Sequence, residues 1–303
     1  MSSAATETQA MERETAWPRI GAFSHGFPEG TLIRMLEQFK EYGLSTVQLS
    51  RDLLAEAMES PAAMARTRRA FAERGMTIAA IAGYRNLIAP DAEKRRAGIA
   101  FVARCLEAAP LLGTSIVATE TGTRHPDDDW TAVPENDRPE SWGLLRAALD
   151  TLVPVAERHG SVLAMEGFVN NVLSTPDQLA RLLDEYRTPH MQVVLDPFNY
   201  LSRDLLLTQE QMVADYLRRF KNRFVVAHLK DVSPDGAEVA TPEFGTGIFS
   251  YAQYFAFLRT ERPDLPIILE HLPIEHIPAA VQRFHTLTGG GAQSTQRAQR
   301  TQR

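Results

Sequence analysis

Residues 161–167 read SVLAMEG, residues 191–197 read MQVVLDP, residues 224–231 read FVVAHLKD and residues 266–272 read PIILEHL. Each stretch is a short apolar run with the length and composition of a β-strand that is buried on both faces. Each run also ends on a side chain that can bind a metal ion: Glu166, Asp196, His228 and Glu270. The ends of neighbouring parallel strands would bring these four side chains to one point.

Four similar apolar runs precede them: RIGAFS (19–24), STVQLS (45–50), TIAAIAGY (77–84) and SIVATET (115–121). Segments with helical periodicity lie between the runs, and no linker rich in Pro, Gly or Ser interrupts the alternation. The pattern predicts an α/β protein with one closed (β/α)8 barrel over residues 17–287. An open, doubly wound sheet is the alternative, but it would normally carry a glycine-rich phosphate-binding turn after its first strand, and none is present there.

Composition excludes several classes of protein. The chain has 303 residues, 44% of them hydrophobic and 23% charged, which is the balance of a globular protein with a sizeable core. A formal net charge of −6 argues against a nucleic-acid partner. No apolar run is long enough to span a membrane and the N-terminus lacks the apolar segment of a secretory signal, so we expect a cytoplasmic protein. Residues 1–16 and 288–303 are polar and low in complexity, and we expect both segments to be flexible.

Three carboxylates and one imidazole are ligands that suit a divalent cation. Any one of the four side chains could instead form a salt bridge at the rim of the barrel or cap a helix. Their occurrence at four equivalent strand ends favours a metal site for Glu166, Asp196, His228 and Glu270 together. We expect one divalent metal ion, with Mn²⁺ favoured and Mg²⁺, Co²⁺ or Zn²⁺ also compatible.

The motifs LAMEG, LDPFN, HLKD, GTGIFSY and ILE, in this order, resemble the xylose isomerase-like TIM barrel superfamily, which includes sugar phosphate isomerases and epimerases. The resemblance covers roughly residues 17–287. It implies that Glu166, Asp196, His228 and Glu270 hold the metal, and that Glu166 and Glu270 form a catalytic acid/base pair. It further implies a metal-dependent isomerase or epimerase of a sugar or sugar phosphate, which works through an enediolate.

One residue departs from the pattern of this superfamily. Many of its epimerases carry a histidine three residues after the aspartate ligand, and here Asn199 stands at that position. Asparagine can bind a substrate hydroxyl but cannot take up a proton. Together with Thr241 and Glu243, Asn199 also argues against the three-zinc cluster of endonuclease IV, a DNA-repair nuclease of the same superfamily.

Other polar residues at the strand ends are candidates for substrate binding. Lys230 is expected to point the same way as His228, where it could bind a substrate oxygen or phosphate, or form an ion pair with Asp231 or a barrel carboxylate. Glu120 ends the fourth run and His25 follows the first. We expect contacts with substrate from Lys230, Glu120, Asn199 and His25.

Three further features stay open. The long segment 122–140 could form a lid or a substrate wall. Gly245 and Gly247 precede a helix, where they could hold a phosphate or only make a tight turn. His271, Glu275 and His276 could suggest a second metal, but His271 is expected to alternate away from Glu270.

Different reaction outcomes are compatible with the same site. The alternatives are a dehydratase or lyase acting on a polyol-derived ketone of the inosose or dehydroshikimate type, and an enzyme that cleaves C-glycosides. A sugar-binding subunit without catalytic activity is a third possibility. The expected partner is a small carbohydrate, and the chain could form a homo-oligomer.

Overall fold

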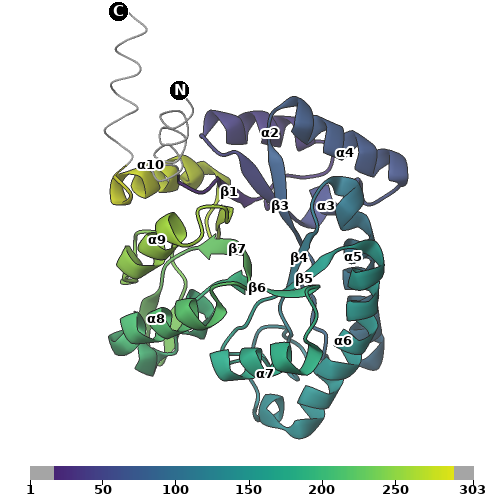
Figure 1. Ribbon diagram of the computed structural model, residues 1–303, viewed down its shortest axis with the longest axis vertical. Coiled ribbons are helices and arrows are strands. Elements are labelled where there is room, and N and C mark those ends of the chain that lie inside the picture. The colour runs from purple at the N-terminus through teal and green to yellow at the C-terminus, as the bar shows by residue number, and fades with distance from the viewer. Residues whose placement is uncertain (1–16, 290–303) are drawn as a thin grey trace, which may run out of the picture.

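The computed structural model describes residues 17–289, and its central feature is a closed barrel of eight parallel strands (Figure 1). The strands follow the order β1-β10-β7-β6-β5-β4-β3-β2 around the barrel. They are β1 (Ile20–Phe23), β2 (Thr46–Leu49), β3 (Thr77–Ala82), β4 (Ile116–Thr119), β5 (Val162–Met165), β6 (Met191–Leu195), β7 (Phe224–Leu229) and β10 (Ile267–Leu269). The first and last strands pair, so the prediction of a single (β/α)8 barrel is confirmed.

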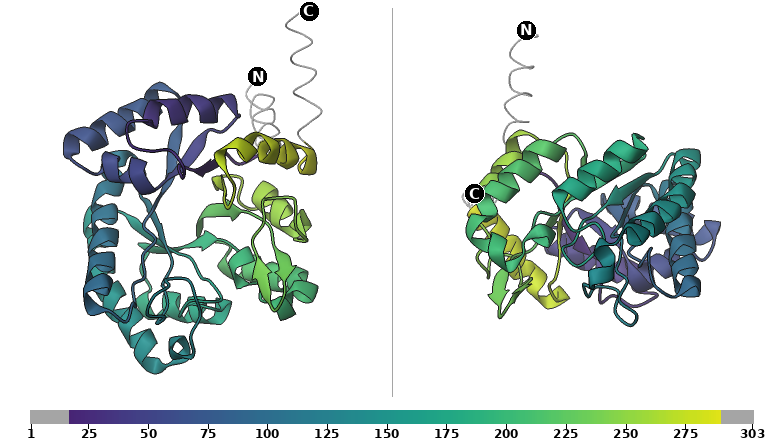
Figure 2. Two further views of the ribbon diagram at one scale, coloured as in Figure 1. Left: turned by 180° about the vertical axis from the view of Figure 1, so that it is seen from behind. Right: turned by 90° about the horizontal axis from the view of Figure 1, so that it is seen from below.

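The α-helices of the described residues surround the barrel, as the two views of Figure 2 show. They are α2 (Leu32–Glu41), α3 (Arg51–Ala57), α4 (Pro61–Glu73), α5 (Ala92–Leu112), α6 (Pro139–His159), α7 (Pro176–Tyr186), α8 (Gln209–Phe220), α9 (Tyr251–Thr260) and α10 (Ile277–Leu287). The sequence did not predict α3, nor the small hairpin of β8 (Ser233–Asp235) and β9 (Glu238–Ala240) in the loop after β7. Short 3-10 helices lie at Pro134–Asp137, Phe198–Tyr200, Arg203–Thr208 and Ile274–His276.

Local sequence signals set the helix ends. Thr175 begins α7 with a capping box, because its Oγ1 accepts from the backbone N–H of Gln178 at 3.2 Å and Gln178 Oε1 accepts from the backbone N–H of Thr175 at 3.0 Å. Gly113 and Gly160 end α5 and α6 in the left-handed conformation, with φ of 93° and 67°. These caps fix where each helix turns back toward the barrel.

The barrel interior is filled by small and medium-sized side chains. They form a cluster of their own: Phe23, Ala79, Ala82, Ala118, Ala164, Val194, Val226 and Ile268. The residues on either side of Ala164, which are Leu163 and Met165, belong instead to the larger core that the helices cover. Because side chains alternate along a strand, the residue two positions after the last interior residue of a strand is expected to face the barrel axis as well.

The long segment after β4 is tied to its neighbours. Asn136 Oδ1 accepts from Thr123 Oγ1 at 3.1 Å and from the backbone N–H of Arg124 at 2.7 Å. Asn136 Nδ2 donates to the carbonyl oxygen of Asn170 at 2.9 Å, in the loop after β5. These hydrogen bonds hold the segment in place against the loop after β5.

The predicted flexible segment 1–16, and residues 290–303 of the predicted tail, lie outside the described residues. Thr288 and Gly289 form a turn after α10. Within residues 17–289, no helix combines the length and apolar character that crossing a membrane requires.

The close approach of β1 and β2 can be tested by a substitution at Gly21 in β1. A Cβ on Gly21 would lie 2.1 Å from the carbonyl oxygen of Thr46, which is backbone and cannot move aside. We expect Gly21→Ala to lower the free energy of unfolding by about 2 kcal/mol, measured by urea denaturation. Gly143→Ala, in α6 with no atom within 4 Å of the new Cβ, is the control and should raise stability by about 0.5 kcal/mol. An unchanged urea midpoint for Gly21→Ala would contradict this account of the strand contact.

Candidate metal centre

The register of the strands places the four predicted metal ligands. Each ligand follows an interior residue of the barrel by two positions, and these pairs are Ala164 and Glu166, Val194 and Asp196, Val226 and His228, and Ile268 and Glu270. By strand alternation all four therefore face the axis at the carboxyl-terminal mouth of the barrel. Glu166, Asp196 and Glu270 directly follow β5, β6 and β10, and His228 lies near the end of β7; these four strands are consecutive around the barrel.

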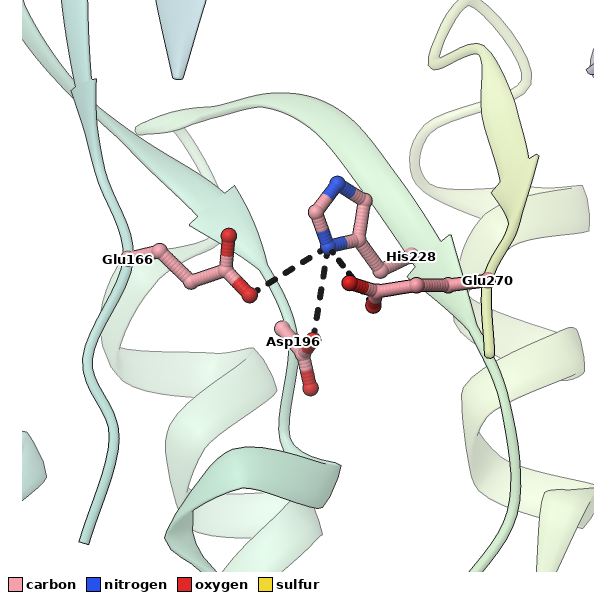
Figure 3. A group of neighbouring side chains, drawn as sticks. All are labelled: Glu166, Asp196, His228 and Glu270. Carbon is pink, nitrogen blue, oxygen red and sulfur yellow. Dashed lines mark ion pairs between the residues drawn. The ribbon is translucent and has the colours of Figure 1, made fainter. Parts of the chain in front are cut away.

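The four side chains converge on one point (Figure 3). His228 Nδ1 lies 3.3 Å from Glu166 Oε1, 3.4 Å from Asp196 Oδ2 and 3.3 Å from Glu270 Oε2. One potential ligand atom from each residue lies within 4.8 Å of every other. Ligand atoms held about 2.1 Å from one ion at tetrahedral angles lie about 3.4 Å apart, so this arrangement could hold a single divalent cation.

Two atoms of the cluster have no hydrogen-bond partner. His228 Nδ1 and Asp196 Oδ2 are buried, and neither makes a hydrogen bond. Lys230 Nζ is 2.9 Å from Asp196 Oδ2, which is close enough for an ion pair but not aligned as a hydrogen bond. Buried polar atoms normally have a partner, and a cation would supply one to both.

The partner of the other imidazole nitrogen sets the tautomer of His228. His228 Nε2 is 2.9 Å from Gln48 Oε1. An amide oxygen can only accept, so Nε2 carries a proton, and in the neutral imidazole the lone pair of Nδ1 is left for a cation held among the carboxylates. Gln48 belongs to β2, where the pairing with β3 shifts register between Val47 and Gln48. Such an irregularity changes the direction of a side chain.

Hydrogen bonds continue from Gln48 to Glu166. Gln48 Nε2 donates to Tyr84 Oη at 3.2 Å, and Tyr84 Oη donates to Glu166 Oε2 at 2.6 Å. The other carboxylate oxygen, Glu166 Oε1, accepts from Asn199 Nδ2 at 2.8 Å. Sequence analysis missed Gln48 and Tyr84. Tyr84 follows the interior residue Ala82 by two positions, and this parity could have identified it.

Lys230 lies beside the carboxylates and is only 1% exposed. Its ammonium is 2.7 Å from Asn199 Oδ1, 2.9 Å from Asp196 Oδ2 and 3.1 Å from Glu270 Oε2. Lys230 therefore forms ion pairs with two barrel carboxylates. Since an ammonium has three protons, these three contacts leave little capacity for a further acceptor. Three carboxylates and one ammonium leave two negative charges, which a divalent cation would neutralise.

Burial and neighbouring charges shift the pKa values of this cluster in opposite directions. Burial alone would raise the pKa of Asp196, but the Lys230 ammonium and His228 together outweigh it and the pKa falls to about 2. Burial is likewise outweighed at Glu270, where Lys230 and His228 hold the pKa well below its usual range. Burial would lower the pKa of His228, but Glu166 and Glu270 raise it well above its usual value. A proton and a cation therefore compete for this cluster.

Two further predicted residues also reach the mouth of the barrel. Glu120 follows the interior residue Ala118 by two positions, and its Oε2 is buried without a hydrogen-bond partner. Burial and the neighbouring Glu166 raise the pKa of Glu120 well above its usual value. His25 stacks on Phe23 with ring centroids 4.7 Å apart, and Phe23 in turn contacts His228 at 5.4 Å.

The glycine loop after β7 is occupied by a carboxylate of the protein itself. Asp231 Oδ2 accepts from the backbone N–H of Gly245 at 3.0 Å and from that of Gly247 at 2.9 Å. Asp231 Oδ1 accepts from the backbone N–H of Val232 at 2.8 Å and from that of Phe249 at 2.9 Å. These amides are not free for a phosphate, so the two glycines make a tight turn around Asp231.

His271 lies differently from the expectation. The prediction that it alternates away from Glu270 is wrong, since its Nε2 is 3.4 Å from Glu270 Oε1. A positive φ of 55° breaks the strand alternation at this residue. His276 pairs instead with Glu243. Among residues 17–289, Glu166, Asp196, His228 and Glu270 are the single group of three or more such side chains that could hold a metal ion.

The fold and the cluster together define a TIM barrel with a candidate metal centre at the carboxyl-terminal ends of its strands. A family model described as xylose isomerase-like TIM barrel matches residues 36–286, and the chain belongs to this family. The predicted superfamily is thereby confirmed. Its members are mostly enzymes, and these bind small sugar substrates.

Several solved structures share the fold. A 3-keto-D-glucoside 4-epimerase from E. coli is 17% identical with a TM-score of 0.68, over 89% of this chain and 99% of that one. A probable 3-DHS dehydratase involved in petrobactin synthesis, from Bacillus anthracis, is 15% identical with a TM-score of 0.66, over 87% and 97%. Endonuclease IV from Thermus thermophilus is 23% identical with a TM-score of 0.69, over 91% and 100%. At these identities the likeness shows the fold alone. A comparison with curated proteins gives no match.

The contact between Gln48 and His228 can be tested directly. Gln48→Leu keeps the volume of the side chain but leaves His228 Nε2–H without its acceptor, so Nδ1 is no longer held as the free nitrogen. We expect the affinity for Mn²⁺ to fall about 10- to 100-fold, measured by calorimetric titration of metal-free protein. Gln38→Leu, on α2 and bonded to Tyr42, is the control and should bind as the unchanged protein does. Equal affinities for both variants would contradict an orienting role of Gln48.

Proposed function

We propose that this protein is a metal-dependent isomerase or epimerase that acts on a small sugar or sugar phosphate. The observation that carries the proposal is the arrangement of Glu166 and Glu270, which follow two different strands, β5 and β10, and each bring a carboxylate oxygen to 3.3 Å from His228 Nδ1 (Figure 3). Two carboxylates that reach one cation from different strands can act as an acid/base pair on a substrate bound beside it.

A divalent cation bound by Glu166, Asp196, His228 and Glu270 would polarise the carbonyl group and the neighbouring hydroxyl of a sugar, and so acidify the C–H bond between them. Glu270 is the more accessible carboxylate, because its side chain is 15% exposed while that of Glu166 is 2% exposed. We assign removal of the proton to Glu270. The resulting enediolate regains a proton at the neighbouring carbon in an isomerisation, or from the side of Glu166 at the same carbon in an epimerisation.

The remaining residues position these two carboxylates. Asp196 and His228 act only as ligands. Tyr84 and Asn199 donate to the two oxygens of Glu166 and fix its orientation. Both ends of the Asn199 amide are bonded to protein groups, and the Lys230 ammonium is hydrogen-bonded to Asn199 and Glu270 and forms an ion pair with Asp196. We therefore assign Lys230 and Asn199 to positioning, although substrate contact was expected from the sequence.

Exchange of carbon-bound hydrogen tests the proposed reaction. With Mn²⁺ in D₂O, we expect the protein to introduce deuterium into at least one substrate among ketoses, inososes and their phosphates, followed by NMR and mass spectrometry. Glu270→Gln should reduce this exchange at least about 1,000-fold, because an amide cannot accept the proton. Glu73→Gln, at the exposed end of α4, is the matched control and should exchange normally.

Two results would contradict the proposal. One is a complete lack of exchange with the metal-loaded protein across the substrate panel. The other is retained exchange in Glu270→Gln at the level of the control. A product that has lost the mass of water would assign the site to a dehydratase reaction, and the isomerase would be replaced by that alternative.

We also propose that Glu120 binds a hydroxyl group of the substrate. Its Oε2 is enclosed and unpartnered at the mouth, and the raised pKa reflects burial and the charge of Glu166. An unpaired buried carboxyl is unfavourable for folding, so its presence is best explained by a contact made only when substrate is bound.

Glu120→Leu should therefore change stability and activity in opposite directions. We expect the free energy of unfolding to rise by about 1 kcal/mol, because an unpartnered buried polar group is removed. We expect kcat/KM to fall about 10- to 100-fold as one hydrogen bond to the substrate is lost. Thermal unfolding and initial rates measure the two effects, with Glu107→Leu on the exposed side of α5 as the control. A loss of stability together with unchanged kcat/KM would assign Glu120 to the fold instead.

A further inference from the structure

The order of the strands divides the barrel mouth into two unlike arcs. Glu120, Glu166 and Asp196 follow β4, β5 and β6, which are consecutive in the barrel. His271, His25 and Arg51 follow β10, β1 and β2, which are also consecutive. One side of the mouth thus carries carboxylates. The other side carries what we call the nitrogen arc, formed by His25, Arg51 and His271, with Glu270 of the metal centre next to it. The proposed reaction leaves the nitrogen arc without a role.

A cavity lies beside the two histidines of the nitrogen arc and Glu270 of the metal centre, and Arg51 is not part of its lining. Its volume is about 210 Å³, and its lining includes Phe23, His25, Glu270 and His271, with aliphatic side chains for the rest. Glu270 is the only acid in this lining; its Oε2 is paired with Lys230, and its Oε1 lies 3.4 Å from His271 Nε2. A group that enters the cavity beside Glu270 therefore meets imidazole nitrogens on its polar side.

Backbone strain marks the same arc. Among residues 17–289, three residues other than glycine have a positive φ, and two of them are Arg51 at 51° and His271 at 55°. This conformation is unfavourable for side chains of their size, and where it persists it tends to lie at functional sites. Both residues directly follow the strand-end segments that line the mouth.

Hydrogen bonds hold the arc in place. The Nδ1 of His271 is 2.9 Å from Thr241 Oγ1, which leaves Nε2 on the side of Glu270. Ser24 Oγ accepts from the backbone N–H of Ser50 at 2.8 Å and donates to the carbonyl oxygen of Ser50 at 3.0 Å. Because Ser24 precedes His25 and Ser50 precedes Arg51, these bonds tie the two residues to one another.

The side chains of the nitrogen arc create a positive potential around His25. Loss of hydration, together with the charges of Arg51 and His271, lowers the pKa of His25 to about 4, while Glu270 acts in the opposite direction. Arg51 forms no ion pair or hydrogen bond with any other described residue through its guanidinium. An anion placed beside Arg51 and His25 would offset the charge of Arg51 and favour the protonated form of His25.

We propose that His25, Arg51 and His271 form a subsite for an anionic group of the substrate, either a carboxylate or a phosphate. Both groups present charged oxygens that accept from guanidinium and imidazole N–H groups. Bound there, the anionic end points the hydroxyl-bearing part of the molecule across the metal centre toward Glu120. This inference deepens the proposed function, and the identification of the anion as part of the substrate rests on it. The binding of the anion itself does not.

Anion binding can be measured without turnover. The probes are inorganic phosphate and D-gluconate, with sorbitol as the uncharged control, added to the Mg²⁺-loaded protein with labelled histidine. We expect phosphate or gluconate to bind and to raise the pKa of His25 by at least one unit, followed by NMR of the imidazole ring, because a nearby anion favours the protonated form. Sorbitol should leave it unchanged. The tighter of the two anions identifies the carboxylate or the phosphate as the better ligand.

Variants then locate the bound anion. Arg51→Asn removes the charge but tolerates a positive φ, and Arg51→Gly relieves the strain altogether. Each should weaken anion binding at least fivefold, as should His25→Phe, which keeps a ring stacked on Phe23. Arg66→Gln, exposed on α4, makes the same charge change elsewhere and should bind within twofold of the unchanged protein.

Two outcomes would overturn the subsite. One is that neither anion shifts the pKa of His25. The other is that the Arg51 variants bind as tightly as Arg66→Gln, which would place the anion on the metal ion. The failures of the two proposals can be told apart. Loss of deuterium exchange with intact anion binding rejects the isomerase, and intact exchange without dependence on Arg51 rejects the subsite.

Discussion

Three carboxylates lie within 3.4 Å of a single imidazole nitrogen at the mouth of a closed barrel, and the surrounding structure compensates for this concentration of buried charge. Leaving such groups unpaired is strongly unfavourable in the protein interior. Lys230 neutralises one charge, and Tyr84 and Asn199 donate hydrogen bonds to Glu166. The two negative charges that remain account for a site suited to a divalent cation.

The barrel itself makes the convergence possible. Alanine occupies interior positions in β3, β4 and β5, so small side chains fill this part of the barrel. The next layer of side chains along the barrel axis forms the mouth. Each of the four proposed metal ligands follows an interior residue by two positions, which means that the register of the strands sets the geometry of the metal centre. A slip of one residue in any of these strands would turn its functional residue outward, into the helices.

The sequence was sufficient for the barrel and for the four clustered side chains because both depend on features that it displays directly. Eight apolar runs with helical segments between them leave few other folds, and metal-binding side chains at four strand ends are conspicuous. Gln48 was not found, because a register shift in β2 decides where it points. Tyr84 was not found either, since an aromatic residue at the end of an apolar run is easily taken for core.

The role of the glycine loop and the direction of His271 could be determined only from the structure. The glycines 245 and 247 could have surrounded a phosphate, and only the structure shows that Asp231 accepts from their backbone N–H groups. His271 was expected to turn away from Glu270, but its backbone adopts the left-handed conformation and breaks the alternation. In both cases the outcome depends on tertiary contacts and single dihedral angles, which periodicity does not record.

The proposed specificity follows from what surrounds the cluster. Proteins described as an epimerase, a dehydratase and an endonuclease share this fold at low identity, so the barrel alone does not choose a reaction. Lys230 touches Glu270 directly and reaches Glu166 through Asn199. Because this chain of contacts joins the two proposed acid/base carboxylates, a proton gained by one changes the electrostatic environment of the other, and they titrate as a coupled pair. Such coupling suits a reaction that takes a proton from one side of a substrate and returns it from the other.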